Sequence, residues 1–105
     1  MKLRVDFGDE QTGEWKSAAV LEPNQAASHG ASSSTWNAQV SFPSGETLQV
    51  GAVYAYANRS LNIVVSQGDT QLFSVFGFKL KETTLDPSML FLSPGGLRVQ
   101  VAVGI

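Results

Sequence analysis

The residues best suited to nucleophilic chemistry lie in one segment, where His29 is followed by Ser32, Ser33 and Ser34. A histidine within hydrogen-bond reach of a serine can take the hydroxyl proton and activate the oxygen. The nucleophile elbow of a hydrolase requires Gly-x-Ser-x-Gly on a rigid strand-to-helix turn. The segment "QAASHGASSS" (25–34) contains neither that motif nor large side chains that would hold it rigid. We therefore expect His29 to be solvated and the serines to be non-catalytic.

The acidic residues show no pattern typical of a metal site or an acid–base site. Nine carboxylates are spread from Asp6 to Asp86, with one histidine and no cysteine in the chain. A metal site requires several such ligands close together, and a glycosidase requires two carboxyls facing each other. The adjacent pair Asp9 and Glu10 follows a strand-like segment, where a solvated turn is the ordinary arrangement. We predict no catalytic residue, no metal and no cofactor, and hence no enzyme.

The charge balance excludes two classes of partner. The net charge is −2 and 15% of the residues are charged, which is not typical of proteins that bind nucleic acid or anionic membranes. No apolar run approaches the roughly 20 residues that span a bilayer. The stretch "MKLRVDFGDEQ" resembles neither a secretion signal nor an organelle transit peptide. The chain as written is therefore expected in the cytoplasm.

The elements that position these residues are predicted to be strands, because the hydrophobic pattern has a period of two. Leu3, Val5 and Phe7 alternate with charged residues and predict a first strand. The stretch "EWKSAAVLE" (14–22) predicts a second strand, or a short helix because of its Ala pair. The small polar residues of 25–34 predict a flexible loop, which we interpret as a long hairpin connection.

Residues 36–56 are predicted to form a hairpin. Trp36 is in phase with Val40 and Phe42, which places it in the predicted core. "PSG" (43–45) supplies the turn, because proline fixes φ and glycine tolerates a positive φ. The alternation then resumes on the returning strand.

The stretch "VVSQGDTQLFSVFGFKL" (64–80) predicts a further hairpin, closed by Gln67-Gly68-Asp69. Phe76 and Phe78 are predicted core residues of its second strand, and Phe73 points to the opposite face. Because both faces are apolar, we expect this strand to be central and covered on both sides. Gly77 marks a bulge or a close backbone approach. The predicted inward series is Leu72, Phe76, Phe78 and Leu80, matched by Leu61, Ile63 and Val65 on the strand before.

A last hairpin is predicted around "SPGG" (93–96), between "MLFL" and "LRVQVAV". The pattern then gives about eight strands, with turn signals roughly every ten residues. We predict an all-β fold, an antiparallel β-sandwich or barrel with hairpin connections. Residues 1–105 would form a single domain, and closure of the two faces would cover the apolar edges.

The aromatic residues are the remaining candidates for function. Tyr54 and Tyr56 share a strand face, and Phe73 lies on the side of its strand away from the predicted core. Aromatic side chains are enriched both at interfaces and in the packed faces of sheets. We predict Tyr54, Tyr56 and Phe73 as a contact surface. In a carbohydrate groove, Trp15 would join the two tyrosines.

Three stretches resemble parts of a known family: "RSLNIVVSQGDTQLFSVFGFKLKETTLDP" (59–87), "RVDFGDEQTGEWKSAAV" (4–20) and "TWNAQVSFPSGETLQV" (35–50). An alternating strand, a Gly-Asp turn, a Phe-bearing strand and a glycine follow in this order. The pattern resembles the domain before the biotin carrier in biotin-containing subunits of acyl-CoA carboxylases, of the 3-methylcrotonyl-CoA and propionyl-CoA type. The resemblance implies a docking domain without catalytic residues. The family's biotin-accepting Met-Lys-Met is absent, as is a pattern for the long helix inside that domain's barrel.

Three functions fit these observations, and none of them is catalytic. The first is a protein-interaction or assembly domain, of which a carboxylase docking module is one version. The second is a barrel that binds a small ligand or a carbohydrate. The third is a self-assembling structural protein of the virion or tail type, which the low charge favours. The expected partner in the first and third is another protein or a second copy.

Overall fold

The computed structural model describes residues 2–24, 32–80, 84–85, 89–93 and 95–104. The regular elements in these ranges are eight β-strands, which confirms the predicted all-β class. None of the described segments is a helix long and apolar enough to cross a membrane. The strands are β1 Lys2–Asp9, β2 Trp15–Leu21, β3 Ser33–Ser41, β4 Thr47–Ala55, β5 Ser60–Gln67, β6 Thr70–Lys79, β7 Met89–Leu92 and β8 Leu97–Gly104.

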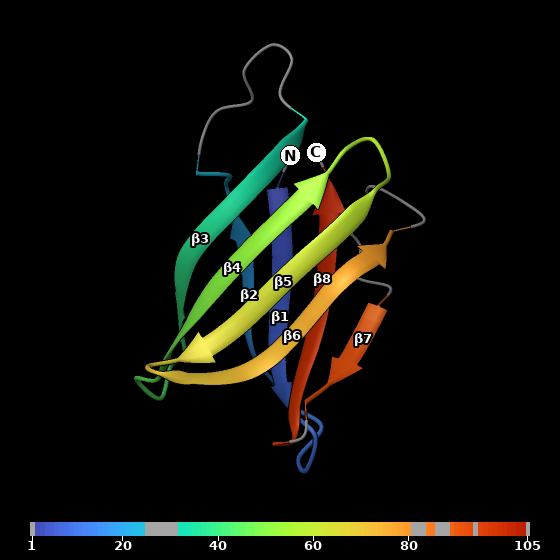
Figure 1. The fold of residues 1–105 in the computed structure, drawn as a ribbon. Helices are drawn as coiled ribbons and strands as arrows, with labels where there is room; N and C mark the ends of the chain where they lie inside the picture. Colours follow the sequence, from blue (N-terminus) through green and yellow to red (C-terminus); the bar gives the residue numbers. More distant parts are fainter. Residues whose placement is uncertain (1, 25–31, 81–83, 86–88, 94, 105) are drawn as a thin grey trace.

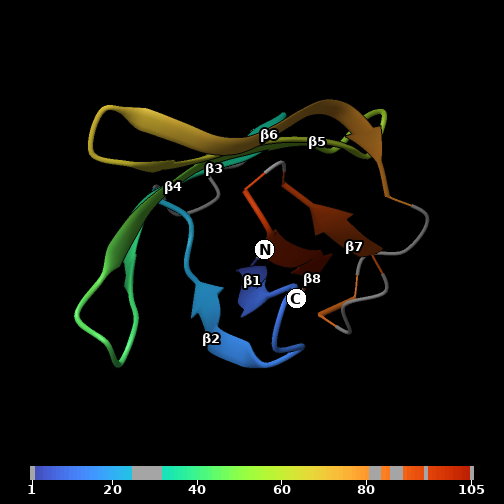
Figure 2. The ribbon, with the colours of Figure 1, turned by 90° about the horizontal axis from the view of Figure 1, so that it is seen from below.

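The strands form two antiparallel sheets of four strands each, in the orders β2-β1-β8-β7 and β3-β4-β5-β6. Figure 1 shows the second sheet in front of the first, and Figure 2 shows the two layers from below. The sheets face each other as a sandwich and do not close into a barrel. Of the two architectures predicted, the sandwich is therefore the one observed.

The two ends of the described chain pair with each other in the first sheet. β1 lies antiparallel to β8, with Lys2 opposite Gly104 and Asp9 opposite Leu97. This pairing joins segments almost a whole chain length apart, so local hairpin patterns do not predict it. It makes β1 and β8 the two central strands of their sheet.

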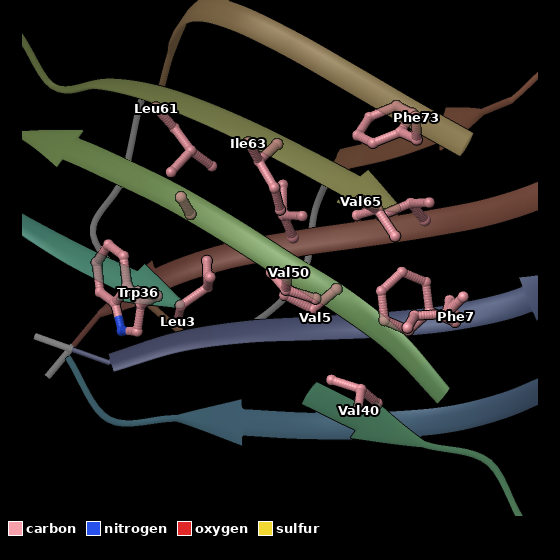
Figure 3. Packing of buried hydrophobic residues seen from close by; sticks show 14 of the residues in the cluster. Leu3, Val5, Phe7, Trp36, Val40, Val50, Leu61, Ile63, Val65 and Phe73 are labelled. Carbon is pink, nitrogen blue, oxygen red and sulfur yellow. The ribbon is translucent and has the colours of Figure 1, made fainter. Parts of the chain in front are cut away.

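The core consists of the side chains that point inward from both sheets. Leu3, Val5 and Phe7 of β1 lie opposite residues of β4 and β5 such as Val50 and Ile63, and all of these are fully buried (Figure 3). Trp36 is 2% exposed, as its phase predicted, and its indole N–H donates to the carbonyl of Leu21 at 3.1 Å. Because Leu21 ends β2 and Trp36 lies in β3, this hydrogen bond links the two sheets.

The segment 25–34 does not connect a hairpin. β2 belongs to one sheet and β3 to the other, so the chain crosses between the layers here, which corrects the predicted hairpin connection. Residues 25–31 of the predicted flexible loop lie outside the described residues. Ser33 and Ser34 already belong to β3.

β6 is an edge strand, and the prediction that it is central was wrong. Its inward phase also changes along its length. Phe73 pairs with Val65, and Phe78 pairs with Leu61, so one extra residue is accommodated in between as a β-bulge. Gly77 stands in this bulge with a φ of 67°, a left-handed conformation that glycine adopts at little cost.

The bulge explains which phenylalanines are buried. Phe73 is 8% exposed and packs in the core, whereas Phe76 is 68% exposed on the outer side. The predicted core position of Phe76 was therefore wrong, because the even-numbered series does not continue across the bulge. Beyond Gly77 the even numbers do point inward: Phe78 packs against the core and Leu80 is buried.

Candidate functional site

The predicted contact residues do not form an exposed surface. Tyr54 is 1% and Phe73 8% exposed, so both belong to the core, which corrects the prediction for these two residues. Tyr56 is half-buried: its ring lies edge-on to Tyr54 at 5.7 Å between centroids, and its hydroxyl is hydrogen-bonded to that of Ser34. The cause is the alternation along β4, in which Tyr54 continues the inward series of Val50.

The groups able to do metal or nucleophilic chemistry are dispersed in the part of the chain that the structure describes. In these ranges, no three histidine, cysteine or carboxylate residues come together as a group that could hold a metal ion. His29 lies outside the described residues, and Ser33 and Ser34 lie in β3. Trp15 is partly exposed, and the guanidinium of Arg98 lies 4.8 Å from its ring centroid.

Asp9 has the most clearly perturbed environment among the described carboxylates. The backbone N–H of Gln11 donates to its Oδ1 at 2.8 Å, and Lys16 Nζ lies 3.5 Å from its Oδ2. The Gln11 N–H, with help from Lys16, holds the pKa of Asp9 below the ordinary 3.8. The backbone of Asp9 also bonds to Glu14 and Gly13 across the turn. These contacts fix the β1–β2 turn and indicate a structural role.

The outer face of sheet β2-β1-β8-β7 carries charged groups. Asp6 is 5% exposed and pairs with Arg4, whose Nε and Nη2 lie 3.2 Å from Oδ1 and Oδ2 respectively. Arg4 Nη1 also donates to the carbonyl of Leu85 at 3.3 Å, so this pair holds Leu85 against the sheet. The four strands of the sheet contain six charged residues, namely Lys2, Arg4, Asp6, Asp9, Lys16 and Arg98.

The other sheet is different, because Lys79 at the end of β6 is the one charged residue in its four strands. Its outer face, turned toward the viewer in Figure 1, consists of amide, hydroxyl, small and apolar side chains. We call this surface the neutral face. A solvated sheet face ordinarily carries many Lys and Glu side chains, and charge depletion is typical of interface centres. The residues at the centre of the neutral face are Thr35, Asn37, Gln49, Gly51, Val53, Asn62, Val64, Ser66, Ser74 and Phe76.

The middle of the neutral face is hollowed. A shallow depression of about 650 Å³ extends over β3, β4 and β5 and reaches Phe76 on β6. Gly51 lies between Asn37 and Val64 in the paired strands, and a Cβ added to it would meet nothing within 4 Å. The missing side chain of Gly51 therefore leaves open space in the floor of the hollow.

Two amides on opposite sides of the hollow are held in fixed orientations. Asn24 Oδ1 accepts the backbone N–H of Asn37 at 3.1 Å, and Asn62 Oδ1 accepts that of Gly77 at 2.6 Å. Because each Oδ1 is used in this way, the Nδ2 group of each amide remains a donor with a defined direction. The hollow thus combines oriented polar groups with apolar surface from Val64 and Phe76.

Phe76 is the residue that sequence reasoning missed. The alternation placed it in the core, but the bulge puts it on the rim of the hollow with 68% of its surface exposed. The signal that could have identified it is Gly77. A glycine within a strand of large apolar residues favours a bulge, and a bulge shifts the inward phase by one residue.

A second depression lies at the end of the sandwich, near the β1–β2 and β3–β4 turns. Its volume of about 260 Å³ is below the roughly 300 Å³ at which small-molecule pockets begin. Asp9 and Lys16 on its rim already bind each other. The neutral face is therefore the stronger candidate site among the described residues.

Comparison of the chain with protein-family models, with curated proteins and with solved structures gives no match. The resemblance to the carboxylase docking domain therefore depends on the quoted stretches alone. The described ranges also form two open sheets without a helix, whereas that domain closes a barrel around one.

Proposed function

We propose that this protein is a non-catalytic interaction domain that binds a partner protein through the neutral face. The observation that carries the proposal is Phe76, a large ring 68% exposed on the rim of an uncharged hollow. Single exposed apolar residues are common on protein surfaces. Here the ring lies beside a sheet face whose four strands contain one charged residue. The centres of protein interfaces are likewise rich in aromatic residues and poor in charged ones.

The hairpins and the core support this role by making the face rigid. The inward sides of β3, β4 and β5 pack tightly against β1 and β8, so the outward side chains project from fixed backbone positions. A preorganised surface loses little conformational freedom on binding, which favours affinity. The proposed role as a carboxylase docking module is one specific version, and it would use this same face.

The hydrodynamic size of the protein in an extract of its source cells tests the proposal. The expected result is that wild-type protein migrates in a complex larger than the 105-residue monomer and that Phe76→Ala protein migrates as the monomer. Val20→Ala is the matched control, because Val20 is 54% exposed on the opposite sheet. Migration of Phe76→Ala protein in the same complex would overturn the proposal. So would wild-type protein that is a monomer both in the extract and after purification and concentration.

A second candidate function is binding of a neutral carbohydrate on the same face. The oriented amides of Asn24 and Asn62 beside an exposed ring favour it, since sugars offer hydroxyls to donors and C–H surface to rings. Wild-type and Phe76→Ala protein can be compared on immobilised neutral glycans. Retention of wild-type but not of Phe76→Ala protein would indicate that the face binds a carbohydrate instead of a protein. If neither protein is retained, this candidate is excluded.

A further inference from the structure

We propose that the partner of the neutral face is a second copy of this chain, bound face to face about a two-fold axis. The inference rests on the function proposed above and names its partner. Its starting point is that a projecting ring and a hollow occupy the same face of one molecule: Phe76 on β6 and Gly51 two strands away on β4.

A two-fold axis between two such faces makes them self-complementary. If the axis passes over β5, midway between Phe76 and Gly51, each Phe76 lies opposite the hollow of the other copy. In a two-fold interface every contact occurs twice, so one ring and one hollow supply two equivalent contacts. The open space above Gly51, free of any atom within 4 Å of an added Cβ, receives the ring.

The charge distribution favours a second copy over a charged partner. When a face with a net charge packs against its own copy, charges of the same sign come close together. Such pairs repel each other. The neutral face avoids this cost because its four strands contain one charged residue, Lys79, which lies at the end of β6. The strands of the other sheet contain four cationic and two acidic residues, a net charge of +2, and that sheet does not have this property.

The polar groups of the face are also compatible with its own copy. Asn37, Gln49 and Asn62 each carry both donors and acceptors, so an amide of one copy can pair with an amide of the other. Asn62 Oδ1 already accepts the Gly77 N–H, which leaves its Nδ2 to donate across the interface. Bridging water can satisfy the remaining groups at little cost.

The available area predicts a weak dimer. The four strands contain 8 to 10 residues each. With a rise of ~3.3 Å per residue and a spacing of ~4.8 Å between strands, the outer face of the sheet covers roughly 500–600 Å² in each copy. The total of about 1,000–1,200 Å² is at the lower end of specific interfaces. We therefore expect a dissociation constant between about 10 μM and 1 mM.

Sedimentation velocity of the purified protein over a range of concentrations tests the dimer. Wild-type protein should convert from monomer to dimer, and Phe76→Ala should weaken the dimer by about tenfold or more, as expected of an aromatic anchor. Gly51→Leu should weaken it similarly, because leucine occupies the hollow and its Cβ meets no atom of its own chain within 4 Å. The matched controls Val20→Ala and Ala18→Leu, on exposed positions of β2, should leave the dissociation constant unchanged.

The double variant Phe76→Ala/Gly51→Leu identifies the contact itself. If the ring of one copy fills the hollow of the other, the added leucine occupies the space that the lost ring vacates. The double variant should then dimerise more tightly than either single variant, a coupling that independent sites do not show. Far-ultraviolet circular dichroism and thermal melting of each variant verify that the fold is intact.

The outcomes separate this inference from the function on which it rests. A purified protein that stays monomeric to about 1 mM, while the extract holds a larger complex that depends on Phe76, overturns the second copy but not the interaction function. A protein that is monomeric both when purified and in the extract overturns the inference and the proposed function. A dimer that Phe76→Ala and Gly51→Leu do not weaken forms through another surface and overturns the inference.

Discussion

At the scale of single residues, Phe73 and Phe76 show how position decides the role of one side-chain type. Phe73 lies in the core with its ring 5.4 Å from that of Phe91, whereas Phe76 lies on the rim of the hollow. Their exposed fractions are 8% and 68%. The first ring therefore contributes to folding, and the second is available for contact.

This contrast gives a stability prediction. Phe73→Ala should lower the free energy of unfolding by about 3–5 kcal/mol, because it removes a buried ring and leaves a cavity. Phe76→Ala should change it by no more than about 0.5 kcal/mol, as is usual for exposed positions. Urea denaturation of both variants at low protein concentration measures the two values. Equal losses would show that the inward phase of β6 has been assigned incorrectly.

Asp9 gives a prediction about pH. The pKa of its folded carboxyl is lowered, so the ionised form stabilises the fold at pH values above the unfolded pKa of about 4. This contribution is lost as the pH falls through the folded pKa. Asp9→Asn removes the charge but keeps an oxygen that can accept the Gln11 N–H.

Wild-type protein should therefore be more stable than Asp9→Asn at pH 7, and the difference should shrink below about pH 4. Thermal melting of both proteins from pH 7 to pH 2.5 measures it. A difference that stays constant down to the lowest pH would mean that the ionisation of Asp9 does not contribute.

At the scale of elements, β6 shows what the sequence pattern predicts and what it does not. The hairpin with β5 and the inward direction of Leu61, Ile63 and Val65 follow from local alternation, and the structure confirms them. The phase of Phe76 does not follow, because alternation assumes a regular ladder and Gly77 interrupts it. Sequence reasoning therefore identified the element correctly but misplaced the residue that carries the candidate site.

The two strand glycines predict opposite effects of one substitution. Gly77→Ala should destabilise the fold by about 1–2 kcal/mol, because its φ of 67° places a Cβ in the strained left-handed region. Gly51→Ala should be neutral or stabilising by up to about 1 kcal/mol, because Gly51 has open space around it and its backbone suits any residue. Urea denaturation compares the two. A larger loss for Gly51→Ala would contradict both assignments.

At the scale of the whole molecule, the two sheets have different surfaces. One carries six charged residues in its strands and the other carries one. Local patterns predicted the strands, the hairpins and the buried Trp36, but they did not predict how the hairpins combine into two sheets. The β1–β8 pairing and the crossing from β2 to β3 depend on contacts distant in sequence. Since the neutral face exists only once β3, β4, β5 and β6 are assembled, residue spacing alone could not identify it.

The central claim is that the molecule associates with a second copy of itself through the neutral face. Nuclear magnetic resonance of the amide-labelled protein, recorded from about 20 μM to about 1 mM, tests it most directly. Concentration-dependent shifts are expected at Gly51, Asn62, Val64 and Phe76, whereas the signals of Val20 and Arg98 should not change. Spectra that do not change over this range, or shifts clustered on β1 and β2 of the charged sheet, would contradict it.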